Sequence, residues 1–247
     1  MSFGASKAIA GPLSAFEKNV EALNQSVLMA GSMLVQSFGP SPALLSFSGS
    51  FLDSSWNASM GGLYADMPVD LLFSGLFNTA LDQGSFTSSG TVGASTWTGA
   101  GTWNFTDPAP LTVAMQGDSD AAITAFGLTL LPDKHYTKII TEKMVGNYLV
   151  RTDTGQWQTT QNGIPVGVPE VVEDSISQIP KDGPQIATAT VSLSNDRILL
   201  QETANFDNGS VTGTLSVPEP STLLLLMAGL WGVLVLKLRQ PCTSGKR

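Results

Sequence analysis

Residues 186–217 read IATATVSLSNDRILLQETANFDNGSVTGTLSV and contain three short runs of apolar and β-branched residues separated by polar breaks. The breaks are Ser-Asn-Asp-Arg at 194–197 and Asp-Asn-Gly at 207–209, and both are rich in turn-forming residues. In the last run Val211 and Leu215 alternate with serine and threonine, as in a strand with one buried face. We therefore predict an antiparallel meander with strands at 186–193, 198–206 and 210–217.

A second strand-like stretch lies at 84–106 and carries no charged residue. Within it Trp97, Trp103 and Phe105 share one parity, whereas threonine dominates the other. Because successive side chains of a strand point to opposite faces, this spacing puts the rings on one face and the hydroxyls on the other. Glycines occupy the alternate positions between the rings on the same face, and they leave room for the rings to pack closely.

The middle of the chain, from 46 to 217, keeps this texture of short runs separated by Gly, Asn, Asp and Pro. It shows no alternation of strands with long helices, which argues against a parallel sheet. We predict that the domain at 44–216 is mainly β, an antiparallel sandwich or barrel. Residues 168–184 are rich in proline and acidic residues, and we expect them to form a long surface loop.

Residues 1–43 form a separate N-terminal segment with two interpretations. Apolar residues recur at spacings of three and four, which predicts a helix with one apolar face: Leu13, Phe16, Val20, Leu23, Val27, Ala30 and Leu34. Such a helix could pack on the domain. Alternatively, the uncharged run at 27–35 could belong to an atypical signal peptide cleaved after Ala43, although Glu17 and Glu21 precede it where basic residues are expected.

The C-terminal segment contains an uncharged apolar run at 222–236, TLLLLMAGLWGVLVL. As a helix this run is roughly 22 Å long, against a hydrocarbon core of about 30 Å. No acid follows it, and its basic residues are Lys237, Arg239, Lys246 and Arg247. A buried core helix is the alternative, but the one-sided charge predicts a C-terminal transmembrane helix with a cytoplasmic tail.

Directly before this run stand Val217, Pro218, Glu219, Pro220 and Ser221. Two prolines around one acid disfavour both helix and sheet, so we expect an extended, accessible linker. The V-P-E-P-S motif, the leucine-rich run and the basic end together resemble the PEP-CTERM sorting signal, over 217–247. The resemblance implies that an exosortase, a membrane-embedded protease, reads the segment. The chain departs from the usual pattern in that 240–245 split the basic residues.

The charge is unevenly distributed along the chain. Lys and Arg number 12 and Asp and Glu number 20, which gives a net charge of −8. Residues 1–220 carry all the acids and 8 of the basic residues, or −12, and the remainder carries +4. An acidic domain of this kind argues against binding to nucleic acid.

The sequence predicts no cofactor and no metal site. The chain has one cysteine, Cys242, and one histidine, His135. A zinc site built from several cysteines or histidines is therefore excluded. Asp118-Ser119-Asp120 begins like a calcium loop, but the pattern breaks at Ala121, and we expect a plain turn.

We expect a non-enzymatic protein that is exported in a Gram-negative bacterium and anchored in the inner membrane. After processing it would occupy the cell surface or extracellular matrix, with a structural or adhesive role in a polysaccharide layer. One alternative is a carbohydrate-binding module, because four tryptophans could stack on sugars instead of filling the core: Trp56, Trp97, Trp103 and Trp157. A surface glycoside hydrolase and an unprocessed tail-anchored protein are further alternatives.

Overall fold

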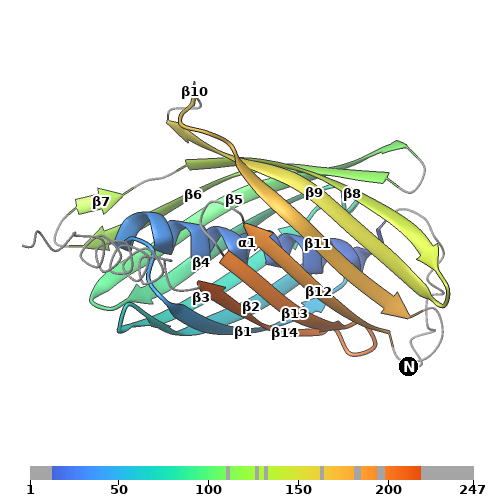
Figure 1. Ribbon diagram of the computed structural model, residues 1–247, viewed down its shortest axis with the longest axis horizontal. Helices are drawn as coiled ribbons and strands as arrows, with labels where there is room; N and C mark the ends of the chain where they lie inside the picture. The colour runs from blue at the N-terminus through green and yellow to red at the C-terminus, as the bar shows by residue number, and fades with distance from the viewer. Residues whose placement is uncertain are drawn as a thin grey trace, which may run out of the picture.

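The computed structural model describes residues 13–109, 112–125, 128–130, 133–161, 164–180, 185–193 and 198–217. These residues form one helix and fourteen strands (Figure 1). In chain order they are α1 (Ala15–Phe38), β1 (Ala43–Leu52), β2 (Ser55–Tyr64), β3 (Met67–Phe77), β4 (Gln83–Val92), β5 (Ser95–Ala109), β6 (Thr112–Ala125), β7 (Leu128–Leu130), β8 (Asp133–Val145), β9 (Tyr148–Gln161), β10 (Ile164–Pro165), β11 (Glu170–Pro180), β12 (Ile186–Leu193), β13 (Ile198–Asn205) and β14 (Ser210–Val217).

The strand pairings run in a complete circuit, and all of them are antiparallel. Strand β8 pairs with β6 on one side and with β9 on the other, and β9 also pairs with β11. From β11 the pairings continue through β12, β13 and β14 to β1, and then along the chain to β6. The short strands β7 and β10 are additions to this circuit. The prediction of a mainly β, antiparallel fold is confirmed.

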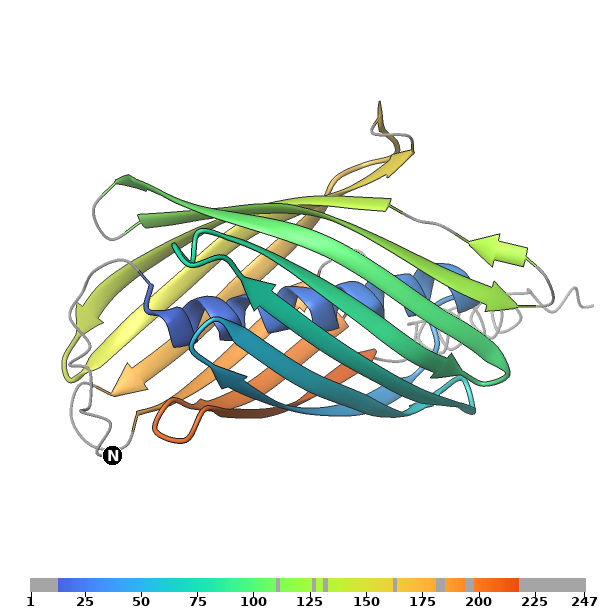
Figure 2. The ribbon, with the colours of Figure 1, turned by 180° about the vertical axis from the view of Figure 1, so that it is seen from behind.

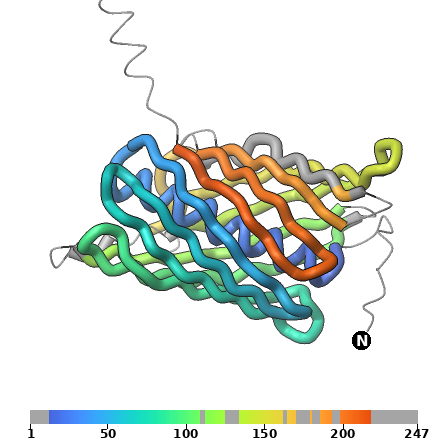
Figure 3. Tube along the Cα trace, turned by 90° about the horizontal axis from the view of Figure 1, so that it is seen from below, coloured from blue at the N-terminus to red at the C-terminus, as the bar shows by residue number. Residues whose placement is uncertain are grey.

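The predicted three-stranded meander is confirmed as well. Strand β12 pairs with β13 from Ile186–Asn205 to Leu193–Ile198, and β13 pairs with β14. Strand β14 then pairs with β1, from Ala43–Val217 to Ser50–Ser210. Figure 3 shows β1 in blue beside β14 in orange-red. The pairing therefore joins the first and last strands of the described chain.

Helix α1 confirms the predicted N-terminal helix and lies inside the ring of strands (Figures 1 and 2). Its start is stabilised by a capping box, in which the Ser14 amide donates to Glu17 Oε2 at 2.6 Å and the Glu17 amide donates to Ser14 Oγ at 3.3 Å. Every residue from Asn19 to Val35 is buried. A surface helix buries one face only, so α1 is an interior element on which the sheet packs from all sides.

Two local predictions were wrong. The loop expected at 168–184 is replaced over Glu170–Pro180 by β11, which pairs with both β9 and β12. Main-chain hydrogen bonds to two neighbours outweigh the weak strand pattern, and register shifts within β11 explain that irregular pattern. The turn expected at Asp118-Ser119-Asp120 lies within β6, where both neighbouring strands pair with it.

No helix in the described ranges is long and apolar enough to cross a bilayer. The transmembrane helix predicted at 222–236 lies outside the described residues.

Glycines allow the aromatic core to approach the sheet closely. The ring centroids of Trp56 and Trp103 lie 6.0 Å apart, and Phe86 stacks on Trp103 at 5.6 Å. Trp56 lies against Gly75 on the neighbouring strand, and a Cβ added at Gly75 would lie 2.2 Å from the indole Cε2. At this position, the absence of a side chain makes room for the ring.

We predict that Gly75→Ala lowers the free energy of unfolding by about 1–3 kcal/mol, because the new methyl group forces Trp56 out of its packed position. Chemical denaturation followed by tryptophan fluorescence measures the effect. Gly61→Ala is the matched control, since a Cβ at Gly61 meets only the Val69 carbonyl oxygen at 3.4 Å. Equal destabilisation by the two substitutions would contradict this packing argument.

Candidate functional site

The predicted sorting segment starts inside the folded domain. Val217 is the last residue of β14, pairs with Ala43 of β1 and is only 2% exposed. The sequence suggested that Val217 opens an accessible linker, which is wrong, because its main chain joins the sheet and its side chain joins the core. An accessible segment can begin only after Val217.

The other predicted signal residues lie outside the described part of the chain. They are Pro218, Glu219, Pro220 and Ser221 of the motif and the basic residues Lys237, Arg239, Lys246 and Arg247.

The end of the sheet around Val217 is tied to the end of α1. Tyr64, at the end of β2, pairs with Ala43 and donates its hydroxyl proton to the Gly39 carbonyl oxygen at 2.5 Å. The rings of Phe38 and Tyr64 lie 6.4 Å apart. The chain therefore leaves β14 from a point that the helix, β1 and β2 hold together.

These observations define a folded antiparallel β domain whose last strand runs directly into a C-terminal segment. A family model of the PEP-CTERM protein-sorting motif matches residues 216–240. No curated protein and no solved structure matches the chain. The chain thus carries a PEP-CTERM sorting signal. Such a signal implies export, anchoring in the membrane before processing, and processing by an exosortase, which is a membrane protease.

All four tryptophans proposed for sugar stacking lie in the core. Their exposed fractions are at most 2%, and they are Trp56, Trp97, Trp103 and Trp157. The indole nitrogen of Trp97 donates to Ser88 Oγ at 2.8 Å, and that of Trp157 donates to Gln25 Oε1 of α1 at 3.3 Å. With their faces covered, these rings offer no platform to a sugar, and they act as packing residues.

An interior network of charges connects α1 to strands β8 and β9, and the sequence analysis missed it. Lys138 of β8 contacts Glu21 of α1 and lies 2.8 Å from Asp153 Oδ2. Arg151 of β9 donates from Nη2 to Glu17 Oε1 at 2.6 Å and to Glu142 Oε1 at 2.8 Å. Each cation thus joins a helix carboxylate to a strand carboxylate.

The environment of the network shifts the pKa values of its members. Burial alone would lower the pKa of Lys138, but Asp153 and Glu21 outweigh that effect and hold the pKa above its usual value. Glu202 of β13 accepts a hydrogen bond from Asn24 Nδ2 of α1 at 2.8 Å. Burial raises the pKa of Glu202 to about 8, although the Asn24 hydrogen bond opposes the shift. Glu202 is therefore mostly protonated at neutral pH.

The network is suited to positioning α1, because its charges are paired and covered by the helix. A buried pair is costly to break, since removal of one partner leaves an uncompensated charge. The sequence does carry a signal for this network. Lys134, Lys138 and Glu142 occupy the same alternate positions of β8 as the core residues Tyr136 and Ile140, which indicates that their side chains point inward.

Within the described residues, no group of three or more His, Cys, Asp or Glu side chains could hold a metal ion.

We predict that Glu202 makes the domain less stable as the pH rises from about 4.5 to about 8. The folded-state pKa lies above the unfolded value, so the folded protein binds the extra proton in this window and stability falls with pH. Glu202→Gln keeps the acceptor for Asn24 and removes this pH dependence. The dependence amounts to at most about 1.4 kcal/mol of unfolding free energy per pH unit. Denaturation curves at a series of pH values measure it.

The control is Thr203→Ser, an exposed change on the same strand that adds and removes no titratable group, and it should leave the pH dependence unchanged. Parallel stability curves for the wild type and Glu202→Gln would show that Glu202 does not titrate in this way.

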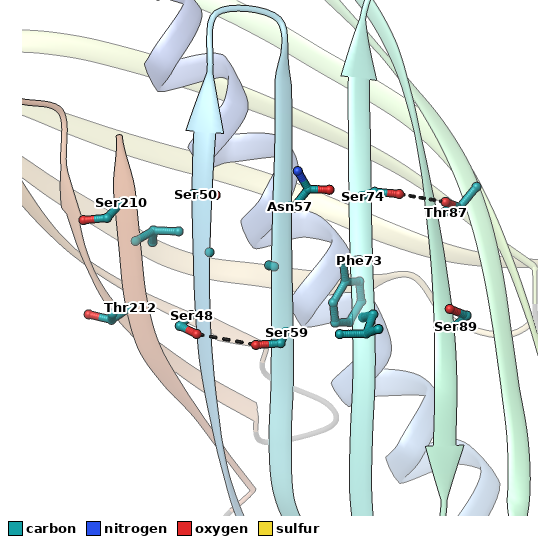
Figure 4. A pocket seen from close by; sticks show the side chains of 14 residues that line it. Ser48, Ser50, Asn57, Ser59, Phe73, Ser74, Thr87, Ser89, Ser210 and Thr212 are labelled. Atoms are coloured by element: carbon teal, nitrogen blue, oxygen red, sulfur yellow. Dashed lines mark hydrogen bonds between the residues drawn. The ribbon is translucent and has the colours of Figure 1, made fainter. Parts of the chain in front are cut away.

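A shallow groove on the outer face of the sheet crosses β14, β1, β2, β3 and β4 (Figure 4). Neutral polar side chains dominate its lining: Ser48, Ser50, Asn57, Ser59, Ser74, Thr87, Ser89, Ser210 and Thr212. Hydroxyls of neighbouring strands contact each other, at 3.5 Å between Ser48 and Ser59 and at 3.0 Å between Ser74 and Thr87. None of the lining residues is charged.

Proposed function

We propose that this chain is a non-enzymatic envelope protein of a Gram-negative bacterium. Its β domain is displayed beyond the inner membrane and then released or transferred by an exosortase to the cell surface or matrix. Its role there is structural or adhesive, within a polysaccharide layer. The observation that carries the proposal is the direct junction between β14 and the PEP-CTERM signal, since the signal then has a folded cargo immediately before it.

The groove on the outer face supports a role beside polysaccharide. A hydroxyl group can either donate or accept a hydrogen bond, and it rotates to suit its partner. A neutral array of hydroxyls therefore matches the hydroxyl-rich surface of a neutral glycan without the cost of removing water from a charge. The same face supports the alternative of a carbohydrate-binding module, which would use Ser and Thr instead of the four tryptophans.

The glycoside hydrolase alternative has less support. Hydrolysis requires two carboxyl groups about 5–10 Å apart that reach the sugar. Glu17 and Glu142 both contact Arg151, but they form part of the network covered by α1. They therefore make a poor pair for an external substrate.

We predict that changing Pro218, Glu219 and Pro220 to alanine leaves the protein as an uncleaved membrane species in an exosortase-bearing host. Mass spectrometry of the membrane and released fractions measures the outcome. The released wild-type domain should retain α1, because removal of 1–43 would empty the interior of the sheet. Unchanged mass and location of the variant would contradict sorting, and a wild-type protein that is never cleaved would favour permanent tail anchoring.

We predict that Ser59→Asp/Thr87→Asp reduces retention of the released protein by a neutral glycan matrix severalfold, since burying either carboxylate against a glycan costs desolvation energy. Co-sedimentation with an insoluble neutral polysaccharide measures it. The control is Thr106→Asp, an exposed threonine of β5 outside the groove. If both variants bind like the wild type, the groove does not contact the polysaccharide.

A further inference from the structure

The outer face of the sheet changes character in its last row before the sorting signal. Leu44 of β1 pairs with Leu63 of β2 on one side and with Ser216 of β14 on the other. Ser216 pairs in turn with Leu199 of β13, and Leu63 pairs with Pro68 of β3. Leu44 is 64% exposed and Leu63 57% exposed. We call Leu44, Leu63, Leu199 and Pro68 the apolar row.

The next two outward rows contain no leucine in β14, β1 and β2, so the paired leucines are a local feature of these three strands. Ser46 pairs with Gly61 and with Thr214, one step further from the signal. Ser48 then pairs with Ser59 and with Thr212. In β14, β1 and β2 these rows carry small and hydroxyl-bearing residues, and two leucines meet only in the row beside Val217. On β3 one exposed leucine, Leu72, pairs with Ser59, but it has no leucine partner on β2. Two exposed leucines side by side need a partner of low polarity to be covered.

The position of the row relative to the anchor indicates what covers it. Ser216, the partner of Leu44 on β14, directly precedes Val217, the last residue of that strand. From Val217 to Thr222, where the apolar run begins, five residue steps span at most about 18 Å even when fully extended. While the run at 222–236 is held in a bilayer, this end of the sheet cannot move far from the lipid surface.

We propose that the apolar row seats the domain on the lipid surface before processing. The inference rests on the proposed function, because it requires the sorting signal to be in the membrane. Leu44 and Leu63 contact the boundary between headgroups and acyl chains, where exposed apolar side chains are stabilised. The seat fixes the orientation of the domain and presents the motif after Val217 at the membrane surface, where its protease is embedded.

The chain offers matched control positions at the other end of the same strands. Leu52 is 75% exposed and Leu76 61% exposed, and both are next to Ser55 in the register. Leu52 lies eight residues beyond Leu44 in β1, which is about 27 Å along an extended strand. A label at Leu52 or Leu76 therefore reports on equally exposed positions that the anchor does not hold near the lipid.

The experiment uses the full chain with Cys242→Ser, which removes its only cysteine. Single variants Leu44→Cys, Leu63→Cys, Leu52→Cys and Leu76→Cys are labelled with an environment-sensitive fluorophore and reconstituted into phosphatidylcholine vesicles. We expect blue-shifted emission and quenching by spin-labelled lipid at 44 and 63. Labels at 52 and 76 should emit as in water and be quenched by aqueous iodide.

The other outcomes separate the inference from the proposed function. If the chain floats with the vesicles but all four labels are aqueous, the lipid seat is wrong and membrane anchoring stands. If the labels at 44 and 63 are protected only in membranes that contain the exosortase, a protein covers the row and the lipid seat is again wrong. If the chain does not float with the vesicles, anchoring by the signal fails and the seat fails with it.

Discussion

The antiparallel pairing of β1 with β14 is the constraint on which the rest of the structure depends. It completes the circuit of strands, so every strand in the circuit pairs with a neighbour on each side, and little of the described sheet is left open to pairing with another chain. The same pairing encloses α1 and holds Val217 beside Ala43. The start of the sorting signal is therefore fixed relative to the helix, because both are bonded to the same end of the sheet.

Enclosure of α1 explains the composition of the interior. A helix buried on all sides has no polar face toward solvent, so its polar residues need partners from the sheet. Lys138 and Arg151 supply them for Glu21 and Glu17, and Glu202 does so for Asn24. Large rings fill the remaining space where glycines such as Gly75 leave the sheet surface bare. On the outer face, serine and threonine dominate only around the groove over β14 and β1–β4, and exposed leucines such as Leu44 and Leu63 lie near it.

The sequence predicted much of this arrangement where local patterns were strong. The meander at 186–217 and the helix around Val20 and Leu34 follow from periodicity, and both are present. The pattern failed for β11, because its backbone register shifts against both neighbouring strands and a period of two in the sequence does not continue through such shifts. The sequence also could not decide whether Trp103 lies on the surface or in the core. The alternation of side chains along a strand shows which residues share a face but not which face is inside.

The sequence by itself determined the strands of the meander, the N-terminal helix and the sorting signal, because each depends on residues close together in the chain. Only the tertiary structure decided that α1 lies within the sheet and that Arg151 joins Glu17 to Glu142. It also decided that Leu44 and Leu63 lie beside the start of the signal. These relations join residues far apart in the chain, and they arise from the register in which the strands pair, which no local pattern specifies.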